Sequence, residues 1–242
     1  MALFKKFEDE IVGDNIDDFF NPEKIRENNS ELTFHDFGSP RLKYLKKIWT
    51  NYINLKWELE RLKNVEVYFS IEKIPDHYSE GGINNLEYYN YHFEHFRIKS
   101  ISIVDYLVLF INHCLQMGIP VKKCNIYSFT ENTIVKDGDL VQSLKAFEKD
   151  ISNLKKDRNK IIHEGTFEPQ SMIPLNDVIV EYEENFIDED DIEQGVLKKD
   201  EIIKAISHFR YEIDMINTHV ENVLNNLIPH IKKQVEIFKL DE

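Results

Sequence analysis

The sequence predicts an all-α protein, a bundle of four to five long antiparallel helices with short helices at its periphery. Long segments repeat apolar residues at steps of three and four, as helices that bury one face do. Only 8 Gly and 7 Pro occur among 242 residues, which suits long helices better than short strands. Because 42% of residues are hydrophobic and 12% are aromatic, the chain can build a core. We expect a peripheral segment over 1–40 and a single helical-bundle domain over 41–242.

The N-terminal part of the chain predicts short helices followed by one long helix. Residues 1–40 hold small apolar clusters among acids, typical of one or two helices packed on the body. Ser39-Pro40 opens the first long helix, whose apolar seam reaches Leu62. From Val65 to Ile71 apolar residues alternate, which indicates either a short strand or a frayed helix end.

The second long helix is expected from about Asn84 to Met117, ending at Gly118-Ile119-Pro120. Its first half is rich in aromatic residues and its second half is apolar nearly all round, which predicts the central helix of the bundle. Asp105 lies inside this apolar run. The connection over 118–138 has a middle part that matches no element.

The third long helix is expected over about 139–163, and the last helix from near Asp200 to the C-terminus. Between them, residues 165–200 form an acidic insertion, with one possible strand at 178–182. Pro229 is expected to kink the last helix. The seam of the third helix is apolar up to the position of Arg158; its residues are Leu140, Leu144, Phe147, Ile151 and Leu154.

The net charge of −14 is concentrated in two peripheral segments. Residues 1–36 carry −6 and residues 176–201 carry −9, which leaves +1 for the rest of the chain. The helical body is therefore close to neutral, so the acidic total does not exclude a nucleic-acid partner.

Cysteine usage and hydropathy predict a cytoplasmic protein. Cys114 and Cys124 are the only cysteines, too few for a disulfide framework and not spaced as a metal-binding pair. No apolar run approaches the roughly 20 residues of a membrane span, and the N-terminus lacks a secretory signal. We expect a soluble protein in a reducing compartment, with no membrane contact.

The third helix ends in the stretch Arg158-Asn159-Lys160-Ile161-Ile162-His163, and Gly165 then favours a helix stop. An arginine on a buried seam costs several kcal/mol unless it is paired, so it is rarely there by accident. His163 belongs to the residue type best suited to exchange protons near neutral pH. These residues indicate a site for chemistry.

This Arg-Asn-x-x-x-His pattern, on the penultimate helix of an all-α domain, resembles the HEPN superfamily. The resemblance places a HEPN-like core at about 84–240, and implies a homodimer whose two motifs line one cleft. It implies metal-independent RNA cleavage with no cofactor, of a toxin or defence type, and a possible cognate antitoxin protein as a partner. His163 would exchange protons with the ribose 2′-hydroxyl or the leaving oxygen. Arg158 would stabilise the charged phosphate, and Asn159 would orient His163.

Other interpretations stay open. Arg158 could pair with a carboxylate, Asp105 or Glu94, in a purely structural role. The domain could be a non-catalytic HEPN-type module that binds a nucleotide, an RNA or a protein, or an interaction protein that works through its acidic insertion. Lys155, one turn before Arg158, could meet a phosphate backbone or belong to a solvated face. His92 and His95 flank Glu94 but lack metal-site spacing, so we expect no metal.

Overall fold

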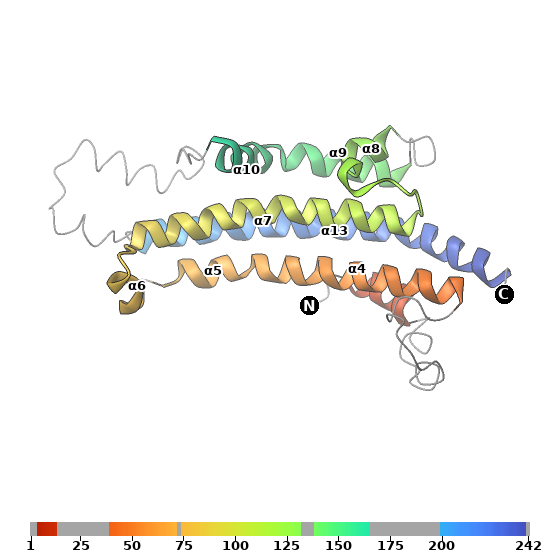
Figure 1. Cartoon of the computed structure of the whole chain (residues 1–242), viewed down its shortest axis with the longest axis horizontal. Coiled ribbons are helices and arrows are strands. Elements are labelled where there is room, and N and C mark those ends of the chain that lie inside the picture. Colours follow the sequence, from red (N-terminus) through yellow and green to blue (C-terminus); the bar gives the residue numbers. More distant parts are fainter. Residues whose placement is uncertain (1–3, 14–38, 72–73, 132–137, 165–198, 241–242) are drawn as a thin grey trace. The chain divides into compact units, whose positions relative to one another are not determined.

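Three long helices dominate the computed structural model of the chain: α4 (Pro40–Leu62), α7 (Asn85–Cys114) and α13 (Lys199–Leu240) (Figure 1). The regular elements of the described residues are all helical, which confirms the predicted all-α class. The expected start at Ser39-Pro40 is also confirmed, because the Ser39 hydroxyl accepts a hydrogen bond from the Leu42 amide. The structure describes residues 4–13, 39–71, 74–131, 138–164 and 199–240.

The predicted third long helix is divided into α9 (Asp139–Asp150) and α10 (Ser152–Glu164), with Ile151 between them. The expectation of one unbroken helix over 139–163 is therefore wrong in this detail. The seam itself continues through the break, since Ile151 is buried and its carbonyl still accepts a hydrogen bond from the Lys155 amide. The last helix is continuous, and Pro229 lies inside it.

Short helices occupy the stretches where the sequence pattern was ambiguous. Residues 64–69 form α5 (Asn64–Phe69), so the helical interpretation of this alternating stretch is the right one. In the unassigned connection, α8 (Ile126–Thr130) begins with a capping box between Asn125 and Ser128. The other short elements are α1 (Lys5–Phe7), the π-helical turn η1 (Glu8–Val12), α6 (Asp76–Glu80) and the 3-10 turn η3 (Val121–Lys123). The possible strand at 178–182, with most of the acidic insertion, lies outside the described residues.

The chain divides into two compact units, and α4, α7 and α13 each contribute a segment to both. The first unit consists of Met1–Trp57, Ile103–Lys149 and Asn217–Glu242. Its core holds apolar side chains from α4, α7, α9 and α13, among them Leu45, Phe110, Phe147 and Leu227. The N-terminal helix packs here, because the Phe7 ring lies 4.8 Å from Tyr52 and 5.8 Å from Phe110.

The second unit consists of Glu58–Ser102 and Asp150–Ile216, and it contains α5, α10 and the candidate site. Phe209 of α13 lies at the centre of its aromatic core, with ring centroids 4.7 Å from Phe69 and 4.8 Å from Phe96. Aromatic pairs in such edge-on geometry add to the stabilisation from burial. This core provides a rigid support for the outer helix α10.

Candidate functional site

Helix α10 presents the predicted motif where its buried seam ends. Leu154 is buried, Arg158 is half-buried, and Asn159 and His163 are exposed. The seam therefore changes from apolar to polar at Arg158, as the sequence predicted. The arginine is less deeply buried than its seam position suggested.

The hydrogen bond between Arg158 and Asn159 draws the motif together. Arg158 and His163 lie five positions apart, about 140° around the helix axis, so their backbone positions do not share a face. Asn159 and His163 are four positions apart and do share one. Nη1 of Arg158 donates to Oδ1 of Asn159 over 3.1 Å, which draws the guanidinium towards the Asn159–His163 face.

Most donors of the Arg158 guanidinium have no partner among the described residues. Arginine has five N–H donors in a planar fork. Among the described residues, the hydrogen bond of Arg158 is the one to Asn159, and its Nε is buried without a partner. A phosphate oxygen is the kind of acceptor that such a fork binds strongly.

Of the predicted supporting residues, Lys155 lies on α10 with the motif, and Glu94 and Asp105 lie on α7. Lys155 is exposed one turn before Asn159, so it lies in the same stripe of α10 as His163. Glu94 is half-buried on α7, where burial raises its pKa, and forms no ion pair with Arg158 among the described contacts. Asp105 belongs to the first unit; burial and then its charge raise the pKa of the Cys124 thiol.

An ionic cluster around a buried arginine holds α10 through the residue next to Arg158. We name it the Arg97 cluster, and its members are Arg97, Asp157, His208 and Glu212. The Arg97 side chain is 1% exposed, and its Nη1 lies 2.7 Å from both carboxylate oxygens of Glu212. Its Nε lies 3.4 Å from Oδ2 of Asp157. The cluster therefore joins α7, α10 and α13 within the second unit.

Aromatic contacts and a histidine complete this cluster. The Arg97 guanidinium lies 4.6 Å from the centroid of the Phe93 ring, a cation–π distance. Nε2 of His208 lies 3.1 Å from Oε1 of Glu212. The ion pair with Asp157 adds to the one with Glu212, and it favours the placement of α10 in which Asp157 reaches Arg97. This placement leaves Arg158 and His163 at the edge of the unit.

The Arg97 cluster was not predicted from the sequence, although the sequence carries a signal for it. Arg97 follows Phe93 by four positions on α7, and Glu212 follows Phe209 by three on α13, so both occupy apolar seam positions. Two opposite charges on the seams of two core helices indicate a buried ion pair. The Asp157 contact has no such signal, since it depends on how α10 is placed.

We predict that Glu212 makes stability depend on pH in the acidic range. Burial would raise its pKa, but the hydrogen bond from His208 and the charge and hydrogen bond of Arg97 outweigh burial and lower it. A carboxyl whose pKa is lower in the folded protein than its unfolded value of 4.5 stabilises the fold at pH values above 4.5. This stabilisation is lost as the pH falls through the folded-state pKa. The free energy of unfolding, measured by urea titration, should therefore decrease below about pH 5 less steeply in Glu212→Gln than in wild type.

The matched control for this measurement is Glu236→Gln. The Glu236 side chain is 66% exposed and pairs with Lys239 on the surface of α13. An identical pH slope in wild type and Glu212→Gln would contradict the assigned role of Glu212.

Comparison with known families identifies the fold. Residues 1–228 match the model of the HEPN_Cthe2314-like HEPN family. The chain belongs to this HEPN family. The match spans the N-terminal region and the acidic insertion as well as the helices. No curated protein and no solved structure matches the chain.

Two further features of this HEPN protein concern the part of the chain that the structure describes. No group of three or more His, Cys, Asp or Glu side chains is placed there to hold a metal ion. None of the described helices combines the length and the apolar character needed to cross a membrane.

Proposed function

We propose that this HEPN protein is a metal-independent endoribonuclease of a toxin or defence type. The observation that carries the proposal is the placement of the motif: His163 and Asn159 are exposed on one face of α10, and Asn159 binds the half-buried Arg158. A residue placed to exchange protons and a forked cation beside it are the two groups that phosphodiester cleavage needs.

The proposed reaction uses the ribose itself as the nucleophile. His163 accepts the proton of the 2′-hydroxyl as the ribose 2′-oxygen bonds to the adjacent phosphorus. At the same time, the bond from phosphorus to the 5′-oxygen breaks. The leaving 5′-oxygen takes up a proton. Arg158 donates hydrogen bonds to the phosphoryl oxygens as charge develops on them. The products are a 2′,3′-cyclic phosphate and a 5′-hydroxyl.

A homodimer would complete the site by placing two motifs around one phosphodiester. One His163 would then act as base while the other, in its acidic form, protonates the leaving oxygen. Lys155 extends the stripe that contains Asn159 and His163, and it supports the proposal as a contact for the RNA backbone. A cognate antitoxin protein would act by covering this surface of α10.

The proposal is tested by incubating the purified protein with a pool of single-stranded and structured RNA in EDTA. We expect cleavage without any added divalent metal. Cleavage that requires added Mg²⁺ or Mn²⁺ would contradict the mechanism. If the protein retains RNA on a filter but cuts none of the pool, the non-catalytic HEPN-type binding module becomes the better description.

A further inference from the structure

The second half of α10, which carries the motif, has little apolar contact with the rest of the second unit. Among the described residues of this helix, Leu154 is the last one that is buried, and Ile161 is half-buried. At a rise of 1.5 Å per residue, His163 lies about 14 Å further along the helix than Leu154. Apolar packing alone therefore holds the motif weakly, so a polar contact in this half of α10 carries more weight.

Asp157 supplies such a contact from the inward face of α10. Counting 100° per residue, it lies about 60° from the buried Leu154 around the helix axis, and about 120° or more from Asn159 and His163. Its side chain is 18% exposed, and its Oδ2 lies 3.4 Å from Nε of Arg97. A contact that holds Asp157 inwards therefore directs Asn159 and His163 outwards.

Arg97 is a fixed anchor for this contact. Its Nη1 lies 2.7 Å from both carboxylate oxygens of Glu212, and its guanidinium packs against the ring of Phe93. Moving the guanidinium away would leave Glu212 without its main cation, which is costly in a buried site. The buried Nε, which has no hydrogen-bond partner among the described residues, then faces Asp157. Arg97 therefore offers Asp157 one fixed position.

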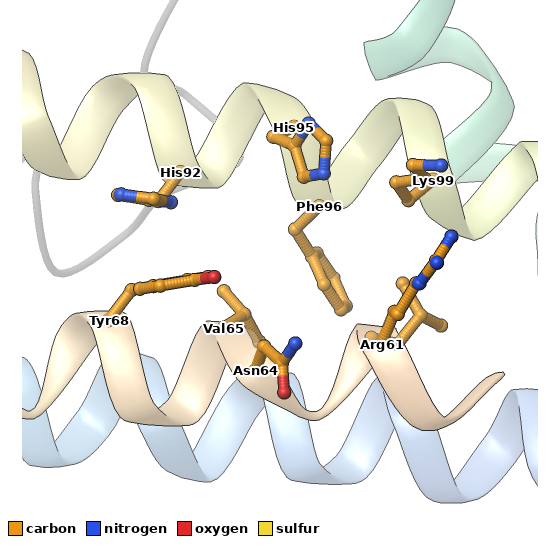
Figure 2. A pocket seen from close by; sticks show the side chains of 9 residues that line it. Arg61, Asn64, Val65, Tyr68, His92, His95, Phe96 and Lys99 are labelled. Atoms are coloured by element: carbon orange, nitrogen blue, oxygen red, sulfur yellow. The ribbon is translucent and has the colours of Figure 1, made fainter. Parts of the chain in front are cut away.

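A different ion pair holds α7 on another side, next to a cleft of about 250 Å³ between α7 and the segment formed by α5 and the end of α4 (Figure 2). Lys99 lines this cleft and lies two positions after Arg97, about 200° around the helix axis from it. Its Nζ lies 2.9 Å from one oxygen of Glu58, and Nη1 of Arg61 lies 2.7 Å from the other. This pair faces away from Asp157, so it provides a matched control.

We infer that Asp157 is a positioning residue of the motif. Anchored on Arg97, it fixes the rotation of the second half of α10, so that Asn159 and His163 stay directed outwards and Arg158 stays beside them. The inference rests on the proposed RNA cleavage, and Asp157 itself touches neither the RNA nor the reacting atoms. Without the anchor, this half of α10 can turn or fray, and a displacement of about 1 Å can lower a rate by about 10²-fold.

The test compares Asp157→Asn with wild type in single-turnover cleavage of one labelled RNA in EDTA, over a range of protein concentrations. The substitution keeps the size of the side chain and removes the charge that faces Arg97. We expect the rate at saturation to fall by about 10–100-fold, and the protein concentration at half-saturation to change by less than about twofold. Asp157→Glu restores a carboxylate, and should recover part of the lost rate.

Glu58→Gln is the matched control, because it neutralises a buried carboxylate that pairs with α7 on its other side. Glu58 has two partners at shorter distances than that between Asp157 and Arg97. Glu58→Gln should therefore lower the urea midpoint at least as much as Asp157→Asn, yet leave the cleavage rate unchanged. Rates that follow the urea midpoints in the two variants would show only a stabilising role for Asp157, and would overturn the inference.

Hydrogen exchange of the backbone amides, measured by mass spectrometry without RNA, tests the anchor independently of cleavage. We expect Asp157→Asn to speed exchange over residues 158–164 by about tenfold, between the effects of losing an exposed and a buried ion pair. Glu58→Gln should leave this exchange unchanged. Unchanged exchange in Asp157→Asn overturns the inference.

The two measurements separate failure of the inference from failure of the proposed function. If wild type and Asp157→Asn cleave RNA equally fast, the inference fails while the proposed function stands. If wild type cleaves no RNA but exchange rises in Asp157→Asn as expected, the proposed function fails while the anchoring of the motif by Asp157 stands.

Discussion

His163→Ala should lower the rate of RNA cleavage in EDTA by about 10²–10⁴-fold, the range that a positioned general acid or base contributes. His163 is exposed at the end of α10, so the substitution should change the free energy of unfolding by no more than about 0.5 kcal/mol. The measurement is the single-turnover rate on one labelled RNA. The matched control is His230→Ala, which removes an exposed histidine from α13 in the first unit.

Substitutions of Arg158 should separate charge from geometry in the same assay. Arg158→Ala removes both, and should lower the rate by about 10²–10³-fold, as loss of one transition-state donor does. Arg158→Lys keeps the charge but not the planar fork, nor the geometry of the hydrogen bond to Asn159. We expect it to recover only a small part of the lost rate. Full activity in Arg158→Ala or His163→Ala would remove these residues from the reaction.

Arg97→Met should lower the free energy of unfolding by about 3–5 kcal/mol, the cost of removing one partner from a buried ion pair. The substitution leaves the Glu212 carboxylate buried at 8% exposure without its main cation, and it removes the contact with Asp157. Urea titration of wild type and variant measures the difference.

Arg210→Met is the matched control, because it breaks an ion pair of similar length on the surface of the same unit. Nε of Arg210 lies 2.6 Å from Oε2 of Glu66, with the two side chains 63% and 25% exposed. The free energy of unfolding should fall by less than about 1 kcal/mol in Arg210→Met. Combining Arg97→Met with Glu212→Gln should restore part of the stability, since the isolated carboxylate is then neutral. Equal losses in Arg97→Met and Arg210→Met would contradict the energetic role of the Arg97 cluster.

The long helices were predictable because their signals are local and repeated. The seam from Leu140 to Leu154 is buried as its spacing indicates, and Ser39-Pro40 marks the true start of α4. The end of α7 was predicted less well, because the helix ends at Cys114 rather than at Met117. The left-handed residue nearest its end is Gln116, with a φ of 51°, and Gly118, with a φ of 64°, follows two residues later. Each of these features depends on residues a few positions apart.

Other features were not predictable because they depend on which helices meet. The break at Ile151 leaves the apolar spacing unchanged, so the periodicity does not show it. Asp157 is an ordinary charged residue in the sequence, and its contact with Arg97 arises only from the packing of α10. The cleft between α5 and α7 likewise exists only because these two helices lie side by side. In contrast, the exposure of His163 follows from its place beyond the last buried seam residue.

The most direct test of the central claim follows a single phosphodiester bond in EDTA. An oligoribonucleotide with one mapped cleavage position is compared with a matched one that carries a 2′-O-methyl group on the nucleotide 5′ to that bond, and the product ends are read by mass. We predict a 2′,3′-cyclic phosphate and a 5′-hydroxyl from the first, and no cleavage at the methylated position of the second. A 5′-phosphate product, or cleavage at the methylated position, would show that the 2′-hydroxyl is not the nucleophile.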